Sequence, residues 1–160
     1  MGRPVRINVG AGDKYFPGWI NVDKHGEQDV FADAAELPFE SNYADEIHAY
    51  HIIEHMHRKQ AARAVENWFK VLKPGGKLVL EMPCLDKIVD LIKGGERNLR
   101  LTLFGLFGDP RDKKPDMMHQ WCYSKSEIAE LLSGSGFRDV TIMDPVFHLQ
   151  ARDFRVEAVK

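Results

Sequence analysis

Several short stretches alternate apolar and polar residues, and this period of two predicts β-strands. The first contains Val5, Ile7 and Val9 and ends at the small residues Gly10-Ala11-Gly12. The same pattern, bounded by Gly, Pro and Asp turn signals, predicts further strands over 19–23, 30–32, 46–50, 77–82, 140–142 and 154–159.

Other stretches place apolar residues every three or four positions, as one face of a helix does. Ala61, Val65, Trp68 and Leu72 share such a face, and the helix should end at Lys73-Pro74-Gly75-Gly76 because proline cannot continue it. Further helices are expected over 85–93 and behind the capping box that begins at Ser124. Residues 94–123 are the least regular part: an apolar helix near 99–107 is followed by a polar run over 108–116.

Strands that alternate with helices predict an α/β fold of Rossmann-like type, with a mostly parallel sheet and helices on both faces. Only the loop 144–153 joins the last two strands. It is too short for a helical crossover, so the C-terminal strand should be antiparallel. A chain of 160 residues suits a single domain, here 1–160.

Candidate ligand contacts follow three successive strands, and open α/β sheets bind ligands at the carboxyl ends of their strands. At Gly10 and Gly12 a ligand can approach the backbone because side chains are absent. Asp23 could accept the ribose hydroxyls of an adenosine, and Asp33 could accept from its adenine amino group. Each residue taken alone also fits a plain turn or a helix cap. The apolar side chains that follow, Leu37 and Phe39, are expected to offer a surface to the ring.

As an ordered set, these stretches resemble the class I methyltransferases that use S-adenosylmethionine (SAM). The resemblance covers most of residues 5–160 and implies a SAM-dependent methyl transfer. A narrower likeness, over 12–23, is to small predicted methyltransferases associated with cell-surface glycan biosynthesis, so a small-molecule or glycan acceptor is expected. The matching stretches are Ile7–Gly12, Asn21–Asp23, Asp33–Phe39, His51–His55, Leu72–Leu78 and Ser124–Phe137.

The resemblance also implies residue roles. The glycine loop would pass under the methionine part of SAM, Asp23 would hold the ribose, Asp33 with the Ala34 backbone would read adenine, and His51 would lie near the methyl group. The segment between Gly12 and Asp23 is shorter than the usual helical crossover, so Lys14 or the loop backbone could replace the usual contact to the methionine carboxylate. The implied cofactor-binding set is Gly10, Ala11, Gly12, Asp23, Asp33, Ala34 and His51.

Histidines supply the candidates for catalysis. A base is needed only if the acceptor must lose a proton, and His51, His55 and His119, with Glu54 beside them, are the candidates by type and place. His51 ranks first because it is nearest a strand end. These histidines, with His57 and Cys122, are also zinc-ligand types, but their spacing matches no closed structural site and no metal is expected.

Overall charge and composition narrow the partners. A formal charge of -2 provides no net attraction to nucleic acid or to an anionic membrane, so neither is expected. No apolar run reaches the roughly 18 residues of a membrane span, and no signal region opens the chain. Two cysteines without a paired spacing favour the cytoplasm. Nothing in the sequence indicates the oligomeric state.

Two other functions stay open. An NAD-linked oxidoreductase would also use Gly10, Gly12 and Asp23, but Tyr15 stands where the third glycine of G-x-G-x-x-G falls. A SAM-binding regulator without catalysis fits the small size. If the protein is an enzyme, residues 94–123 are the expected acceptor-side lid, because long irregular segments in compact domains are often functional.

Overall fold

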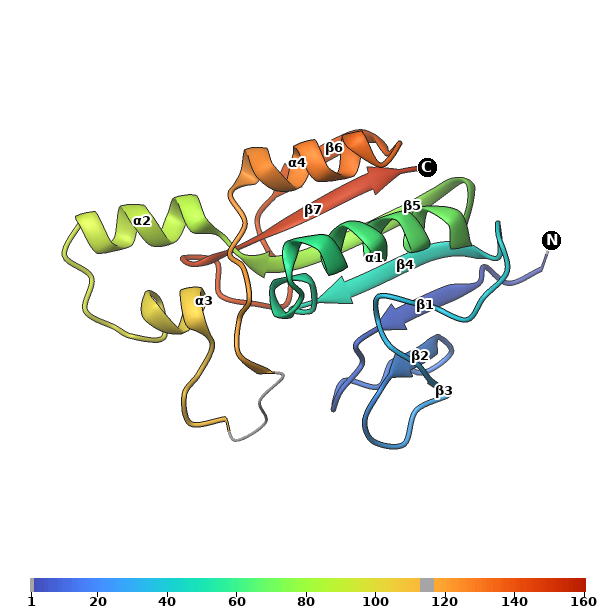
Figure 1. Cartoon of the computed structure of the whole chain (residues 1–160), viewed down its shortest axis with the longest axis horizontal. Coiled ribbons are helices and arrows are strands. Elements are labelled where there is room, and N and C mark those ends of the chain that lie inside the picture. Colours follow the sequence, from blue (N-terminus) through green and yellow to red (C-terminus); the bar gives the residue numbers. More distant parts are fainter. Residues whose placement is uncertain (1, 113–116) are drawn as a thin grey trace.

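The computed structural model describes residues 2–112 and 117–160 as one seven-stranded sheet with helices (Figure 1). The strand order is β3-β2-β1-β4-β5-β7-β6. The five strands from β3 to β5 are parallel, and β7 runs antiparallel to both β5 and β6. The expected mostly parallel sheet with an antiparallel C-terminal strand is therefore confirmed. The strands are β1 (Arg6–Val9), β2 (Ile20–Asp23), β3 (Val30–Phe31), β4 (Ala44–Tyr50), β5 (Leu72–Pro83), β6 (Arg138–Met143) and β7 (Asp153–Val159).

The helices form close to where their sequence signals stand. Ser124 caps α4 as expected: its hydroxyl accepts a hydrogen bond from the Glu127 backbone N–H at 3.1 Å, which satisfies one of the free donors at the start of the helix. The helices are α1 (Arg58–Val71), α2 (Leu85–Lys93), α3 (Leu103–Phe107) and α4 (Lys125–Gly134), with a short 3-10 turn, η1 (Ile53–His55).

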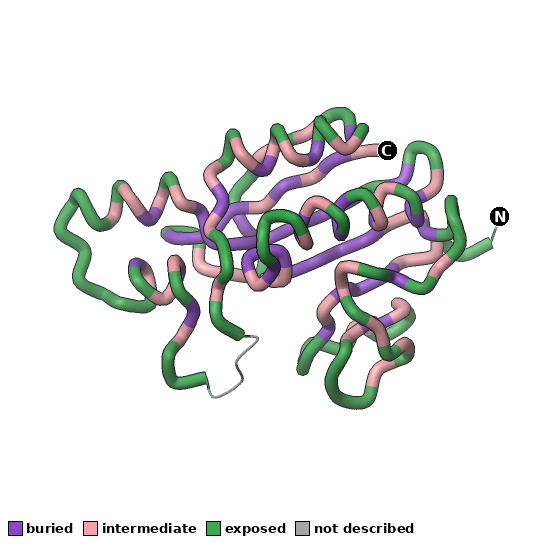
Figure 2. The backbone as a smooth tube through the Cα atoms, in the orientation of Figure 1, coloured by how far each residue is buried: buried purple, intermediate pink, exposed green. Residues whose placement is uncertain are grey.

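The main core lies on one face of the sheet, where α1 and α4 pack side by side (Figures 1 and 2). Trp68 of α1 and Ile128 of α4 are fully buried there against Leu80 of β5 and Val156 of β7. The Trp68 indole N–H also donates to the Ala34 carbonyl at 2.8 Å. This bond ties α1 to the loop that follows β3, one of the loops expected to contact adenine.

The expectation of helices on both faces holds for one face only. Among the described residues no helix covers the other face, since α2 packs against α3 instead of the sheet. The loops between β1, β2 and β3 are too short to form crossover helices. On the face without helices, aromatic rings from two loops pack against β4. The ring centroids of Trp19 and His48 are 4.6 Å apart, and those of Phe147 and Tyr50 are 5.0 Å apart. Polar positions on this face, such as buried His48, explain why loops suffice.

Candidate functional site

A cavity of about 530 Å³ lies at the carboxyl ends of β1, β2 and β4. This volume is within the range of small-ligand sites. Ile52 and Met56 provide apolar surface in its wall. The lining includes every residue of the cofactor-binding set from the sequence: Gly10, Ala11, Gly12, Asp23, Asp33, Ala34 and His51.

The two glycines of the first loop differ in what they do. Gly10 has φ +67°, and a Cβ there would lie 1.8 Å from the Ile52 Cδ1 atom, so packing alone requires glycine. Gly12 has φ +48°, and no atom lies within 4 Å of where its Cβ would be. The backbone at Gly12 is therefore open to a ligand, whereas Gly10 holds the loop against the turn after β4.

Both acidic side chains of the cavity are held by backbone donors. Asp23 accepts from the Gly12 N–H at 2.9 Å and from the His25 N–H at 2.8 Å. Asp33 accepts from the Ala35 N–H at 2.8 Å. Because an ionised carboxylate has about four acceptor sites, each can still accept from a ligand while the backbone fixes its direction.

The expectation for Leu37 and Phe39 is wrong. Leu37 is 3% exposed and belongs to the core, while Phe39 stacks on Tyr43 at 5.1 Å. Neither lines the cavity. Their apolar character reflects core packing behind the loop.

A second cavity of about 550 Å³ adjoins the first, and Lys14, His51, His55, Met117 and His148 line both. Much of its remaining wall comes from the irregular segment, as far as the structure describes it: residues 113–116 of the expected lid and of its polar run lie outside the described residues. The lining side chains from that segment are Arg100, Phe104, Asp109, Asp112, Met117 and His119.

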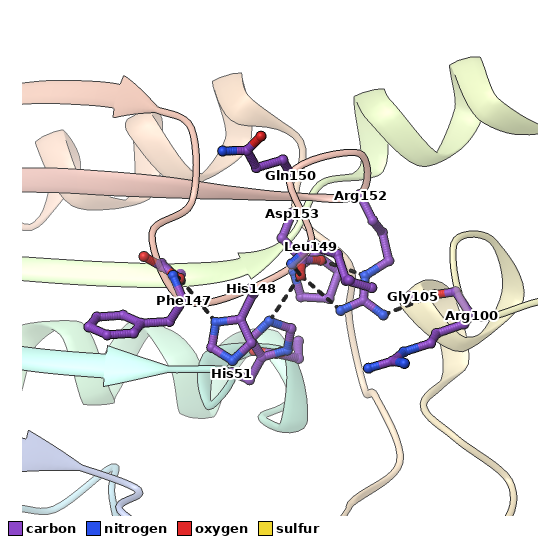
Figure 3. Close-up of polar contacts among 12 residues, drawn as sticks. His51, Arg100, Gly105, Phe147, His148, Leu149, Gln150, Arg152 and Asp153 are labelled. Atoms are coloured by element: carbon purple, nitrogen blue, oxygen red, sulfur yellow. Dashed lines mark hydrogen bonds and ion pairs between the residues drawn. The ribbon is translucent and has the colours of Figure 1, made fainter. Parts of the chain in front are cut away.

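His51 stands at the junction of the two cavities with φ +53° (Figure 3). Its Nδ1 lies 2.9 Å from Glu54 Oε1, and its Nε2 lies 3.4 Å from Asp153 Oδ2. Burial by itself would lower the pKa of His51, but the two carboxylates outweigh it and raise the pKa to about 9. His51 is therefore protonated at neutral pH, which argues against its use as a base.

A buried glutamate that the sequence reading missed anchors the loop beside His51. Glu81 of β5 is 0% exposed and accepts from the Val146 and Phe147 N–H groups at 2.8 and 3.1 Å. It also contacts His148 Nδ1 at 3.0 Å, and the His148 ring lies 4.0 Å from that of His51 (Figure 3). A glutamate inside an otherwise apolar strand was the available signal.

His148 and Arg152 were missed for a different reason: they lie in the loop before β7, which was read only as a connection. His148 Nε2 lies 3.0 Å from the Lys14 Nζ atom. Arg152 forms two hydrogen bonds to the Asp153 carboxylate and one to the Arg100 carbonyl. The loop thus joins the glycine-loop side of the site to the irregular segment.

The other two histidine candidates lie together on the second cavity's side. His55 and His119 have ring centroids 4.9 Å apart. The Glu54 carbonyl accepts from the Gln120 and Trp121 N–H groups at 2.7 and 3.2 Å, which aligns residues 117–121 with η1. Burial lowers the pKa of His119, so its ring is neutral at pH 7.

The remaining zinc-ligand types do not join this group. His57 is exposed at the start of α1. Burial, with a smaller effect of Glu54, raises the pKa of the Cys122 thiol to about 12, so Cys122 is not a thiolate. Neither Cys122 nor Cys84 forms a disulfide.

Comparison with known proteins gives a family match for part of the chain. The family model described as methyltransferase domain matches residues 16–80, a span that starts after the glycine loop and ends within β5. No curated protein matches the sequence. No helix in the described ranges is long and apolar enough to cross a membrane.

Solved structures share the fold at low identity. A SAM-dependent methyltransferase from Thermotoga maritima, described as a possible histamine N-methyltransferase, is 15% identical with a TM-score of 0.69, covering 100% of this chain and 84% of that one. A SAM-dependent methyltransferase from Archaeoglobus fulgidus is 18% identical with a TM-score of 0.68, covering 99% and 87%. The 1,6-didemethyltoxoflavin-N1-methyltransferase of Burkholderia thailandensis, solved with 1,6-didemethyltoxoflavin and S-adenosylhomocysteine, is 16% identical with a TM-score of 0.65, covering 99% and 72%.

Proposed function

We propose that the chain is a SAM-dependent methyltransferase, as the family match over residues 16–80 and the shared fold of the solved structures support, and that its two cavities bind the two reactants. SAM occupies the cavity at the ends of β1, β2 and β4. The acceptor, a small molecule or a glycan-type compound, occupies the adjoining cavity. The single observation that carries the proposal is the shared wall between the two cavities, where His51, His55 and His148 line both.

The proposed orientation of SAM follows from the residues at each strand end. The ribose hydroxyls bind Asp23, and the adenine lies toward Asp33 and Ala34. These residues follow β2 and β3, whereas His51 of the shared wall follows β4, on the other side of β1 in the sheet. The methionine part passes over Gly12, where the backbone is open. Lys14 lines both cavities, and its ammonium group is the proposed partner of the methionine carboxylate in place of a helix N-terminus.

The chemistry asks little of the protein beyond alignment. A nucleophilic atom of the acceptor forms a bond to the SAM methyl carbon while the carbon–sulfur bond breaks, and the bonding pair stays on sulfur. Holding both reactants in line supplies most of the rate gain. We propose that His51, already protonated and ion-paired, holds the wall in place, and that the acceptor's nucleophile lies against His55 and His119.

The lining of the second cavity favours a polar acceptor. Basic side chains at Lys14, Arg100 and Arg152 stand with the acidic Asp109 and with the ring of Phe104. Such a mixture suits a compound with several hydroxyl or charged groups and a flat or ring-shaped body. The small-molecule substrate of the Burkholderia neighbour adds support for the small-molecule reading, and a sugar would meet the same requirements.

Calorimetry with SAM, S-adenosylhomocysteine and NAD tests the cofactor assignment. We expect both SAM compounds to bind and NAD not to bind, and binding of NAD alone would refute the assignment. Release of S-adenosylhomocysteine in the presence of a panel of hydroxylated and amine acceptors tests catalysis. SAM binding without turnover on any acceptor would favour the regulator that the small size leaves open.

A further inference from the structure

Three ligating side chains gather beside the second cavity, and none of them is assigned a contact with SAM above. Glu54, His55 and His119 each offer one ligand atom, and these atoms lie within 4.8 Å of one another. His55 and His119 line the second cavity, while Glu54 lies behind them in η1. One carboxylate and two imidazoles form a ligand set that divalent transition metals prefer.

Glu54 is the unusual member of the group. It is 1% exposed, yet neither carboxylate oxygen receives a hydrogen bond from the described residues. Its one close cation is His51, with Nδ1 2.9 Å from Oε1. Buried carboxylates normally accept several hydrogen bonds, because an unsatisfied one is costly. A cation beside Glu54 would supply what the protein's own donors do not.

Both imidazoles use one ring nitrogen for a backbone carbonyl. His119 Nδ1 lies 2.9 Å from the Gly105 carbonyl oxygen, and His55 Nδ1 lies 3.4 Å from the Met118 carbonyl oxygen. A carbonyl can only accept, so in the neutral form of each ring these contacts place the proton on Nδ1 and leave the lone pair on Nε2. Ligating histidines commonly use one nitrogen for the metal and the other to donate to a carbonyl or carboxylate.

The backbone brings the group together from distant parts of the sequence. The η1 turn places Glu54 and His55 next to each other, and the Glu54 carbonyl bonds Gln120 and Trp121. Those hydrogen bonds place the neighbouring His119 beside Glu54 and His55. The spacing of these residues in the sequence matches no closed structural zinc site, and no metal was expected from it. The structure instead presents three ligands, a number typical of sites that keep a position open for a substrate.

We propose that Glu54, His55 and His119 bind one divalent first-row transition-metal ion on the acceptor side of the site. Metal–ligand distances of about 2.0–2.2 Å would place the three ligand atoms well inside the 4.8 Å that now encloses them. Two imidazoles disfavour Mg²⁺ and Ca²⁺, which prefer oxygen ligands. Zn²⁺ and Co²⁺ are therefore the probes.

The role of the ion rests on the proposed function. An acceptor hydroxyl bound at the open position would lose its proton more readily, since the cation stabilises the resulting anion. The proton passes to solvent, the oxygen forms the bond to the SAM methyl carbon, and the sulfur keeps the electrons of the broken bond. In this arrangement the imidazole lone pairs hold the ion, so neither His55 nor His119 serves as a base.

The test measures metal binding without SAM. Protein treated with a chelator and then dialysed is titrated with Co²⁺, whose visible absorption reports its ligands, and with Zn²⁺ by calorimetry. We expect one ion per chain. Glu54→Gln keeps the side-chain shape and His119→Ala leaves the His51–Glu54 ion pair intact, and each should weaken binding by at least about tenfold. His57→Ala removes an exposed neighbouring histidine and should leave affinity unchanged.

Each outcome decides the proposal, with folding of every variant verified by thermal melting. Absence of a bound ion in the wild type would overturn the site. Wild-type affinity in both Glu54→Gln and His119→Ala would also overturn it and would indicate adventitious surface binding. Metal bound normally by a protein that does not bind SAM would refute the proposed function and leave the metal site standing. Normal SAM binding without metal binding would refute the metal site and leave the proposed function standing.

Discussion

The cofactor side and the acceptor side of the site are built in different ways. On the cofactor side, the lining residues stand at the ends of three neighbouring parallel strands, β1, β2 and β3. Backbone groups of the neighbouring loop hold the polar side chains, as the Gly12 N–H holds Asp23. On the acceptor side, η1, α3, the segment 117–121 and the loop before β7 form the wall. Ion pairs of His51 join η1 to the start of β7 there. One side depends on chain geometry and the other on tertiary contacts between charged groups.

This difference predicts how each side responds to substitution. Changes on the cofactor side should act on the local backbone and on SAM affinity. Changes at the junction of the acceptor side should affect the whole fold, because removing one member of a buried ion pair leaves the other without compensation. The expected effects below run from the largest to the smallest.

His51→Ala should be the most damaging change. It leaves buried Glu54 without its ion pair and removes one of the two cationic partners of Asp153, which keeps Arg152. Breaking a buried pair of this kind costs about 3–5 kcal/mol of unfolding free energy. Urea denaturation checks this value. His25→Ala, at an exposed position, is the control. A loss below about 1 kcal/mol would show that the ion pairs are not what holds the acceptor side together.

Gly10→Ala should cost about 2–4 kcal/mol, combining left-handed backbone strain with overpacking. The new Cβ would overlap Ile52, so Ile52→Ala in the same chain should recover part of the loss. Gly12→Ala is the matched control, because a Cβ there meets no other atom and only the left-handed backbone, with φ +48°, disfavours it. It should lower the free energy of unfolding by about 1 kcal/mol. Equal losses at both glycines would contradict the packing role assigned to Gly10.

Asp23→Asn should act mainly on the cofactor. Losing charge-assisted hydrogen bonds to the ribose removes about 1.5–3 kcal/mol of SAM binding, which is roughly tenfold to a hundredfold in dissociation constant. Calorimetry with S-adenosylhomocysteine measures it. Asp29→Asn, outside the cavity at the Asn21 backbone, should leave the affinity unchanged. A folded Asp23→Asn protein with normal affinity would remove Asp23 from the ribose site.

The pH dependence of stability offers a separate test of the junction. The pKa of His51 is raised from 6.5 to about 9, so its stabilising contribution is complete below pH 6.5 and is lost as pH rises through 9. Glu54 and Asp153 have pKa values lowered to about 2, with burial outweighed chiefly by His51. Their contribution is complete above pH 4.5 and is lost as pH falls through 2. Urea midpoints across pH 5–10 should fall at the alkaline end in wild type, and the fall should be smaller in His51→Ala.

The same contrast explains what the sequence could predict. The positions of the strands along the chain, the antiparallel last strand and the cavity residues from Gly10 to Ala34 follow from local patterns, because each ligand contact stands at the end of a strand. Glu81, His148 and Asp153 could not be placed, since their roles depend on which loop covers the sheet. Leu37 was wrongly expected to face the adenine ring, because an apolar residue after a strand fits a ligand surface and a core position equally well.

The smallest effect is expected from Arg100→Gln on the acceptor side. The Arg100 side chain lines the second cavity, but its structural tie to Arg152 uses the backbone carbonyl, which the substitution keeps. Stability should therefore change by less than about 0.5 kcal/mol, and SAM affinity should stay the same. If the irregular segment forms the acceptor-side lid, the KM for a polar acceptor should rise severalfold with little change in kcat, as lost ground-state binding requires. Steady-state kinetics at saturating SAM measures both constants, with the exposed Arg97→Gln as the matched control outside the cavity lining. An unchanged KM for every accepted substrate would place the acceptor elsewhere and remove the proposed lid from the site.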